Sequence, residues 1–539
     1  MKKKLIFAAA AIAMLASCSQ NDLEAPVVAQ AQQSDAIEFG TYIGKAAGSR
    51  AGWAGDIDNN KLKDLNAAGN AQEVSTNGFG VFAYYTGTDG YNDKNGAYDA
   101  AGKIAPNFMY NEHIYYDNDN TKWKYDNIKY WPNEIQDGAV DVPGASTDYA
   151  NGGKITFFAY APYVSESTIW GSETSGITGM TSNTTAGDPI LTYTFAKTGK
   201  NVDLLWGTYG STSATVLDAT NSGVVSTATT VSPRPVANRA SWPVDILSTT
   251  AGTPTDYKLN GDLVKQKISG TVDFNFKHAL SKVGGTSTTS PLNSAGLQIV
   301  LDADAVAAQD AASNTVVSVE DIKITTQKMA YLDNNGTASS EDKYITGGTF
   351  NLATGKWTVN VSDDAANKIV HELTTSGTGV SGKLNADIAE PTSVTNMNEV
   401  SSKRTLNGTV TGVTGSPKNV YGDVTSPMLF IPGTKPKFDI EITYYVRSFD
   451  SKLANTTPGA TKTGETGTWT NVKQTIKKEV EFADYTQLNK RYSLLIHLGL
   501  TEVKFTASVS AWDDDNTAID TDSNGTGDTN IVNLPLNVN

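Results

Sequence analysis

The sequence predicts an all-β protein, and two observations carry that prediction. Only 18% of the 539 residues are charged, while Gly, Ser, Thr, Asn and Asp are abundant, as in extracellular β proteins rather than helical ones. Apolar and polar residues alternate with a period of two in five runs, at 79–85, 155–160, 272–276, 438–444 and 503–509. We therefore expect strands with one apolar face on a core and one polar face in water.

Turn residues and loops separate these runs. Asn-Gly pairs suit tight turns because both residues tolerate positive φ, and they occur at 95–96, 335–336, 407–408 and 524–525. Two stretches rich in Ser, Thr, Gly and Pro, at about 164–190 and about 207–260, are interpreted as long loops or insertions. The chain is longer than one hydrophobic core usually serves, so we expect two β-sandwich domains, 51–262 and 263–539.

The first 17 residues have the pattern of a secretory signal peptide. Three lysines precede an apolar run from Leu5 to Leu15 that ends in small residues. The run is shorter than the roughly 20 apolar residues that span a bilayer. Cys18 follows at once, so this stretch resembles a lipoprotein signal-peptidase box, in which residues 1–17 are removed and Cys18 is diacylated, for example with palmitate. The alternative is an incidental cysteine inside a cleaved leader.

Charge and motif content disfavour several classes of function. The formal net charge of -15 repels phosphate backbones, so nucleic acid is not an expected partner. Cys18 is the only cysteine, and once it is acylated no thiol remains for disulfides, metal sites or nucleophilic catalysis. The four histidines lie far apart in the chain, and no Gly-x-Ser-x-Gly elbow or phosphate-binding loop occurs. We therefore expect neither an enzyme nor a cofactor.

Two weaker candidates for binding sites remain. Oxygen ligands alternate before a turn glycine, as in calcium loops, at Asp520, Asp522 and Asn524, with Asp528 beyond. Ile531 occupies the place of the closing glutamate, so a solvated loop without metal is the preferred interpretation. Aromatic side chains that stack on glycans are the second candidate, and they are sought first at Trp123, Trp131 and Trp206. Core packing is the preferred interpretation of these tryptophans.

The N-terminal segment of the mature chain contains a predicted edge strand followed by a cleavage site. The strand's alternating side chains include Ile37, Phe39 and Ile43. Arg50 and Ala51 lie in a loop of small residues that a trypsin-like protease can enter. Cleavage between them releases residues 18–50, a propeptide that carries both the lipid anchor and the strand, and it exposes an apolar groove.

The last residues of the chain form a second predicted strand. Its apolar members alternate with Asn and Pro, and they are Val532, Leu534, Leu536 and Val538. A proline suits an edge or inserted strand better than a central one. An acceptor groove at one end and a donor strand at the other predict head-to-tail strand addition, which propagates as a filament. The alternative is that the tail completes a sheet of its own domain.

Several motifs are spread over nearly the whole mature chain. They are Gly-Phe-Gly-Val-Phe-Ala-Tyr at 78–84, Lys-Tyr-Trp-Pro at 129–132, Phe-Phe-Ala-Tyr-Ala-Pro-Tyr at 157–163, Asp-Leu-Leu-Trp-Gly at 203–207, Phe-Lys-His-Ala-Leu-Ser-Lys-Val at 276–283 and Tyr-Ser-Leu-Leu-Ile-His-Leu-Gly-Leu at 492–500. Together they resemble the motifs of the fimbrillin family of Bacteroides-type bacteria, the type V pilins and their minor-fimbria relatives. The resemblance implies a lipidated precursor, two transthyretin-like β-sandwich domains, cleavage by an arginine-specific protease and polymerisation by strand exchange. Arg50 matches the family's cleavage position by context, and residues 531–538 match the donor segment by position and alternation.

The expected function is that of a structural subunit of a cell-surface fimbria that supports adhesion. Its expected partners are other fimbrial subunits, an arginine-specific protease and, before cleavage, the outer membrane through the lipid anchor. The expected route is export through the periplasm to the cell surface. The alternative is a monomeric, surface-anchored glycan-binding lipoprotein, or an anchor or tip accessory protein of a fimbria.

Overall fold

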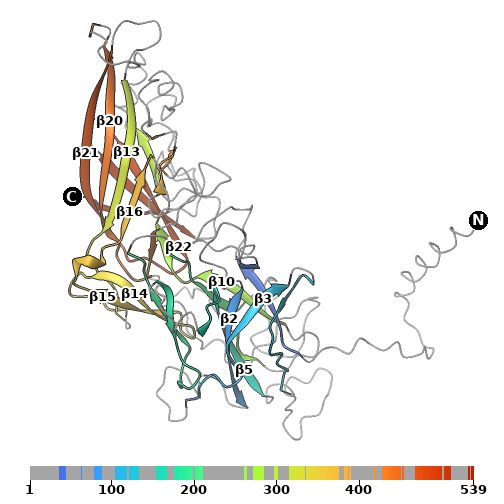
Figure 1. Ribbon diagram of the computed structural model, residues 1–539. Helices are drawn as coiled ribbons and strands as arrows, with labels where there is room; N and C mark the ends of the chain where they lie inside the picture. Colours follow the sequence, from blue (N-terminus) through green and yellow to red (C-terminus); the bar gives the residue numbers. More distant parts are fainter. Residues whose placement is uncertain are drawn as a thin grey trace, which may run out of the picture. The chain divides into compact units, whose positions relative to one another are not determined.

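The structure is a computed structural model, and its strands are drawn in Figure 1. It describes residues 36–43, 62–63, 78–87, 91, 103–117, 120–132, 153–166, 175–197, 201–209, 260–263, 271–283, 297–301, 315–333, 336–375, 382–385, 388–389, 418–420, 428–450, 452–453, 468–500, 503–511, 532–534 and 536–538. Within these ranges no helix has the length and apolar character needed to cross a membrane.

The described elements confirm the predicted all-β fold, with strands arranged in four sheets. Every one of the five alternating runs forms a strand. These strands are β2 (Phe79–Gly87), β5 (Lys154–Ala161), β10 (Thr271–His278), β20 (Lys437–Asp450) and β23 (Val503–Ala511). The period of two in the sequence was therefore a sound guide to the local structure.

The first sheet has the order β1-β10-β8-β5-β2-β3-β4, and β9 pairs with β5. The remaining members are β1 (Glu38–Ile43), β3 (Met109–Asp117), β4 (Lys122–Lys124), β8 (Leu205–Tyr209) and β9 (Asn260–Leu263). In β2, Phe79 and Val81 belong to one buried cluster, while Phe82 and Tyr84 belong to another. The expectation of a polar, solvated face is thus wrong for this strand, because both of its faces are covered.

The second sheet has four strands in the order β15-β14-β7-β6. They are β6 (Gly176–Met180), β7 (Ile190–Thr194), β14 (Tyr344–Asn351) and β15 (Lys356–Ser362). Strand β6 corrects the interpretation of 164–190 as loop alone, since glycines interrupt its apolar alternation and hide it in the sequence. The indole N–H of Trp206 in β8 donates to the Leu352 carbonyl oxygen beside β14, at 2.9 Å. This bond joins the first sheet to the second.

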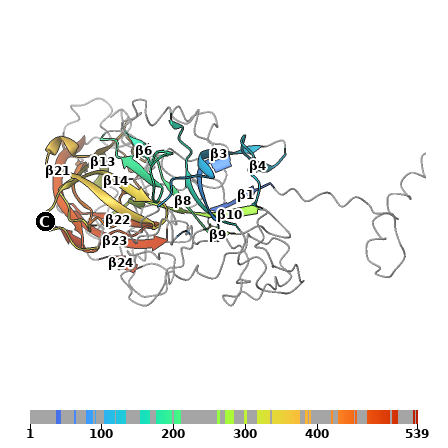
Figure 2. The same ribbon diagram turned by 90° about the horizontal axis from the view of Figure 1, so that it is seen from below.

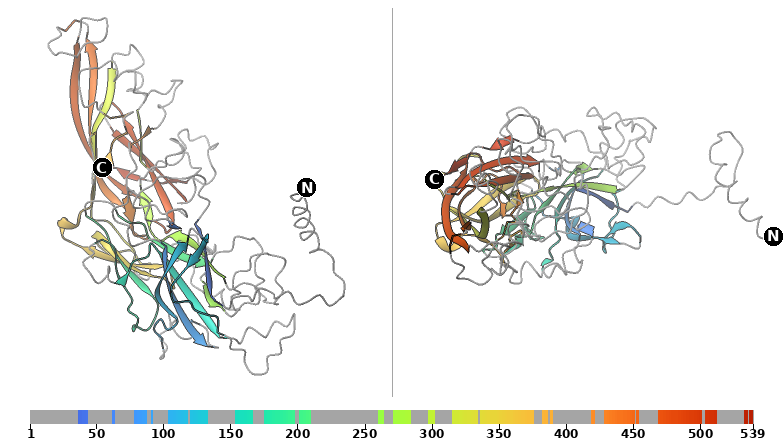
Figure 3. Two further views of the ribbon diagram at one scale, coloured as in Figure 1. Left: turned by 45° about the vertical axis from the view of Figure 1, so that its right-hand side comes forward. Right: turned by 90° about the horizontal axis from the view of Figure 1, so that it is seen from above.

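The other two sheets are built mainly from the second half of the chain (Figures 2 and 3). In one, the order is β18-β12-β22-β11-β19, and β23 and β24 extend it from β22. In the other, the order is β17-β16-β13-β20-β21-β25. Their bounds are β11 (Ser281–Val283), β12 (Leu297–Leu301), β13 (Thr315–Thr326), β16 (Val370–Thr374), β17 (Gly382–Lys383), β18 (Lys418–Asn419), β19 (Met428–Phe430), β21 (Thr468–Phe482), β22 (Lys490–Leu498), β24 (Val532–Leu534) and β25 (Leu536–Val538). Buried aliphatic side chains from both sheets share one core, among them Val317, Ile440 and Ile496.

Strands from both sides of residue 262 share sheets. Strand β10 lies between β1 and β8 in the first sheet, and β7 pairs with β14 in the second. The sheets are therefore not divided at one point in the chain. The division into domains at 51–262 and 263–539 stays a prediction.

Candidate functional site at the two ends of the chain

Strand β1 is the terminal strand of the first sheet, and it runs parallel to β10. Its register places Glu38 opposite Thr271 and Ile43 opposite Phe276. Just before the strand, the Ile37 backbone N–H donates to the Lys129 carbonyl oxygen at 2.9 Å. Among the described residues, the strand therefore lies between β10 and the segment that follows β4, which is hydrogen-bonded to the chain just before the strand.

The side chains of Ile37 and Phe39 point into the core of the first sheet, with exposed fractions of 1% and 5%. The Phe39 ring lies edge-on to Phe157 and stacks on Phe274, each with a centroid distance of 6.1 Å. The Tyr125 hydroxyl donates to the Ile37 carbonyl oxygen at 2.8 Å. These contacts show that β1 fills an apolar groove rather than lying on the surface.

The bond from Tyr125 persists at physiological pH. Burial raises the pKa of this tyrosine to about 12, so its hydroxyl keeps the proton that it donates. Burial of one Phe or Ile side chain contributes about 1.5 to 3 kcal/mol. Loss of Ile37 and Phe39 from the groove therefore costs about 3 to 6 kcal/mol. A replacement strand must bring apolar side chains at alternate positions to recover that free energy.

The structure places the three predicted residues of the displaced strand in or beside β1. Ile37 and Phe39 are buried as expected. For Ile43 the structure describes the backbone pairing with Phe276. The role of these residues in strand displacement stays a prediction.

The predicted donor strand is divided into two short strands, which pair within the same chain. In β24, Val532 lies opposite Val509 and Leu534 lies opposite Ala507 of β23. In β25, Leu536 and Val538 lie opposite Phe482 and Val480 of β21. Each strand has three residues, and the two strands end different sheets. In this single chain the tail therefore extends its own sheets, as the alternative interpretation holds, and its role as a donor stays a prediction.

Other predicted site residues lie outside the described part of the chain. These are the lipidation residue, the cleavage pair and the weak calcium candidates, namely Cys18, Arg50, Ala51, Asp520, Asp522, Asn524 and Asp528. Among the described residues, no group of three or more His, Cys, Asp or Glu side chains is arranged to hold a metal ion.

The tryptophans considered for glycan stacking mostly lie in the core. Trp131 and Trp206 have exposed fractions of 4% and 2%, so neither ring can stack on a glycan. Trp123 is partly exposed and packs edge-on against Phe79, with a centroid distance of 5.0 Å. The preferred interpretation, core packing, is confirmed for Trp131 and Trp206.

A buried polar pair was not found from the sequence. His278 Nδ1 and Asp203 Oδ2 lie 2.7 Å apart, and both side chains are almost fully buried. Both residues belong to motifs that the sequence shows, but nothing local indicates that the two motifs meet. Asp203 lies just before β8 and His278 ends β10, so the pair links the ends of these two paired strands.

Comparison with known proteins gives a match in sequence over part of the chain and weak likenesses in structure. The chain is 36% identical over 124 residues to fimbrium subunit Fim1C of Phocaeicola vulgatus, a match that covers 23% of this chain and 25% of that protein. The chain thus spans about a quarter of the length of the curated relative that it matches. No family model matches.

One likeness in structure is to a fimbrial protein from Bacteroides vulgatus, at 17% sequence identity and a TM-score of 0.45. It covers 88% of this chain and 99% of the other chain. A likeness at this TM-score does not by itself establish a shared fold. The sequence match to a fimbrium subunit, however, accords with the motifs along the chain, and it supports a fimbrillin-family protein.

Proposed function

We propose that this protein is a structural subunit of a cell-surface fimbria, assembled by strand exchange after cleavage between Arg50 and Ala51. One observation carries the proposal. The strand that precedes Arg50 in the chain is a sheet-end strand, and its Ile37 and Phe39 side chains fill an apolar groove. A cut at Arg50 breaks the chain between β1 and the next described strand, β2.

The assembly has a simple physical sequence. The precursor is exported, acylated at Cys18 and held at the outer membrane, and an arginine-specific protease then removes residues 18–50. The emptied groove exposes the rings of Phe157 and Phe274, which favours any strand that covers them again. The alternating tail, residues 532–538, of another copy supplies such a strand. Because donor and acceptor lie on different parts of the chain, the contact is head-to-tail and repeats as a filament that supports adhesion.

The first test uses a chain that begins at residue 19 and therefore lacks Cys18. Treatment with an arginine-specific protease is expected to cut after Arg50 and to produce a ladder of oligomers on a non-denaturing gel. A matched chain without residues 530–539 should be cut equally well and should remain monomeric. Assembly that is independent of the cut, or of the tail, contradicts the proposal.

A second test holds β1 in its groove. Gly40 and Asp273 are paired in the register of β1 and β10, so Gly40→Cys with Asp273→Cys places two thiols across the strand pair at a separation suited to a disulfide. We expect the oxidised variant to be cut at Arg50 without assembling, and to assemble after a reductant is added. The control is Gly40→Cys alone, which should assemble in both conditions. Assembly of the oxidised double variant rules out displacement of β1.

A second candidate function is favoured by the pairing of the tail. Because β24 and β25 pair with β23 and β21 of the same chain, the tail can also be a permanent part of its own sheets. The protein is then a surface-anchored accessory or glycan-binding lipoprotein that stays monomeric. Resistance of Arg50 to the protease, together with a persistent monomer, supports this candidate over the polymerising subunit.

A further inference from the structure

Thr41 is a polar residue on the face of β1 that fills the apolar groove. Ile37 and Phe39 are buried in the groove, and the alternation of a strand places Thr41 on the same face. Its register partner in β10 is the fully buried Phe274. The Thr41 hydroxyl oxygen is itself buried, and it has no hydrogen-bond partner among the described residues. The strand that occupies the groove is therefore mismatched to it at this position.

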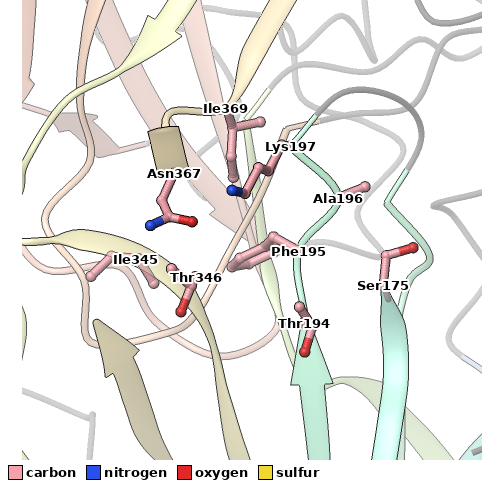
Figure 4. A pocket seen from close by; sticks show the side chains of 9 residues that line it. All are labelled: Ser175, Thr194, Phe195, Ala196, Lys197, Ile345, Thr346, Asn367 and Ile369. Atoms are coloured by element: carbon pink, nitrogen blue, oxygen red, sulfur yellow. The ribbon is translucent and has the colours of Figure 1, made fainter. Parts of the chain in front are cut away.

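Other threonines in the described sheets and loops bond their hydroxyls. Figure 4 shows one of them, Thr346, at the edge of a cavity of about 370 Å³ around the ring of Phe195. Its hydroxyl donates to the Asn360 carbonyl oxygen at 3.2 Å. The fully buried Thr434 donates to a backbone carbonyl oxygen at 2.7 Å. Within the described ranges, Thr41 is the only threonine whose buried hydroxyl oxygen lacks a partner.

A buried hydroxyl without a partner weakens the hold of β1 on its groove. Such a group loses its bonds to water on folding and gains none in return. When the strand leaves the groove, the hydroxyl regains those bonds, so the mismatch favours opening. The effect on the opening equilibrium is about 5- to 150-fold, which corresponds to about 1 to 3 kcal/mol at 1.4 kcal/mol for each factor of ten.

The tail of the chain carries no such mismatch. Positions 37, 39, 41 and 43 share one face of the N-terminal strand, and the alternating apolar residues of the tail are Val532, Leu534, Leu536 and Val538. A tail inserted in the direction of β1 places Leu536 where Thr41 lies. A tail inserted in the opposite direction places Leu534 there. In both directions a leucine takes the place of the hydroxyl.

We propose that Thr41 is a specificity-determining residue of the exchange. Its mismatch makes β1 a removable occupant of the groove and favours a strand with an apolar residue at that position. Thr41 has this role only where assembly proceeds by the proposed strand exchange. The other end of the strand is held more firmly, because the Tyr125 hydroxyl and the Lys129 N–H acceptor, its carbonyl oxygen, bind the backbone of Ile37. Opening therefore begins at the end of β1 that is nearer to Arg50 along the chain.

The test uses the chain from residue 19 to 539 with Thr41→Val. Valine has nearly the shape of threonine and the same branching at Cβ, so the change removes the hydroxyl and leaves the preference for a strand unaltered. Hydrogen exchange in the uncut chain measures opening at the amides that pair β1 with β10. We expect opening to become about 5- to 150-fold rarer in Thr41→Val than in the natural chain.

The same variant is then cut with an arginine-specific protease. Residues 19–50 should leave the cut chain more slowly in Thr41→Val, by a factor comparable with the change in opening. Oligomers should appear correspondingly later on a non-denaturing gel. The rate of the cut after Arg50 should not change, because Thr41 lies outside the loop that the protease enters.

Two controls separate the hydroxyl from other effects of the substitution. Thr41→Ser keeps the hydroxyl, and it should not make opening rarer. Thr358→Val makes the same change at an exposed position of β15, and it should alter neither opening nor assembly. Thermal unfolding of each variant shows that its fold is intact.

A further pair of variants tests the tail. A tail with Leu534→Thr and Leu536→Thr brings a hydroxyl to the place of Thr41 in either direction of insertion. It should assemble less completely than the isosteric tail with Leu534→Val and Leu536→Val. Equal assembly by the two tails overturns the selection of an apolar strand by the groove.

Two results overturn the role of Thr41 in the exchange. One is equal opening of β1 in Thr41→Val and in the natural chain, because the hydroxyl then carries no cost. The other is rarer opening with unchanged release of residues 19–50 and unchanged assembly, because Thr41 then affects stability alone. A natural chain that is cut but never assembles contradicts the proposed strand exchange, and the role of Thr41 with it, even where hydrogen exchange shows the mismatch.

Discussion

Phe39→Ala should strongly weaken the attachment of β1 to its sheet. The ring is 5% exposed and contacts Phe157 and Phe274 in the core. Removal of a buried Phe ring costs about 3 to 5 kcal/mol. Because each 1.4 kcal/mol is a factor of ten in an equilibrium constant, local opening of β1 should become about 100- to 4,000-fold more frequent.

Native-state hydrogen exchange measures this opening at the backbone amides that pair β1 with β10. Glu38→Ala is the matched control, since Glu38 lies in the same strand and is exposed, and it should change the exchange rates by less than threefold. After cleavage at Arg50, the Phe39→Ala chain should also lose its N-terminal peptide sooner on a gel-filtration column. Equal exchange rates in Phe39→Ala and Glu38→Ala would refute the conclusion that Phe39 anchors β1.

Three further predictions concern stability. Burial and the neighbouring Glu372 raise the pKa of Asp321 to about 6, so deprotonation of this side chain destabilises the folded chain. Asp321→Asn should therefore add about 1 to 2 kcal/mol to the unfolding free energy at pH 7.5 and nothing below pH 4, as urea titration can show. Burial lowers the pKa of the partly exposed His371 to about 4, so the unfolded chain takes up this proton at a higher pH than the folded chain does. The unfolding free energy of the natural chain should therefore fall by about 1 to 2 kcal/mol between pH 6.5 and pH 4, and His371→Gln should remove that loss. Trp206→Phe leaves the buried Leu352 carbonyl oxygen without its donor and opens a void, so the unfolding free energy should fall by about 2 to 4 kcal/mol. An unchanged unfolding free energy in any of these three variants would contradict the cause given for it.

The strands could be predicted because their signal is local. Alternation in 438–444 and 503–509 reports the pleat directly, and both stretches are strands. The two buried faces of β2 were missed, although its run from Phe79 to Tyr85 contains no charged residue, which is typical of a strand covered on both sides. The Tyr84 hydroxyl, for example, donates to the Gly187 carbonyl oxygen inside the fold.

The candidate site was only half visible in the sequence. Ile37 and Phe39 could be assigned to a strand from their spacing. The burial of Phe39, however, depends on Tyr125, Phe157 and Phe274, which come from three other segments of the chain. The cavity around Phe195 left no sequence signal. Its walls come from segments between 175 and 369, and each segment alone has an ordinary strand or turn pattern.

By itself the sequence determined the features that depend on neighbours along the chain: the leader-like N-terminus, the β period, and an alternating apolar segment near each end. Tertiary structure alone decided which strands meet. The parallel pairing of β1 with β10, and the pairing of β25 with β21, join residues far apart in the chain. The hydrophobic effect is nondirectional and does not depend on how far apart two segments lie in the sequence. Such pairings are therefore selected by how well whole apolar faces fit together. For that reason a groove or a cavity becomes visible only when the sheets have been assembled.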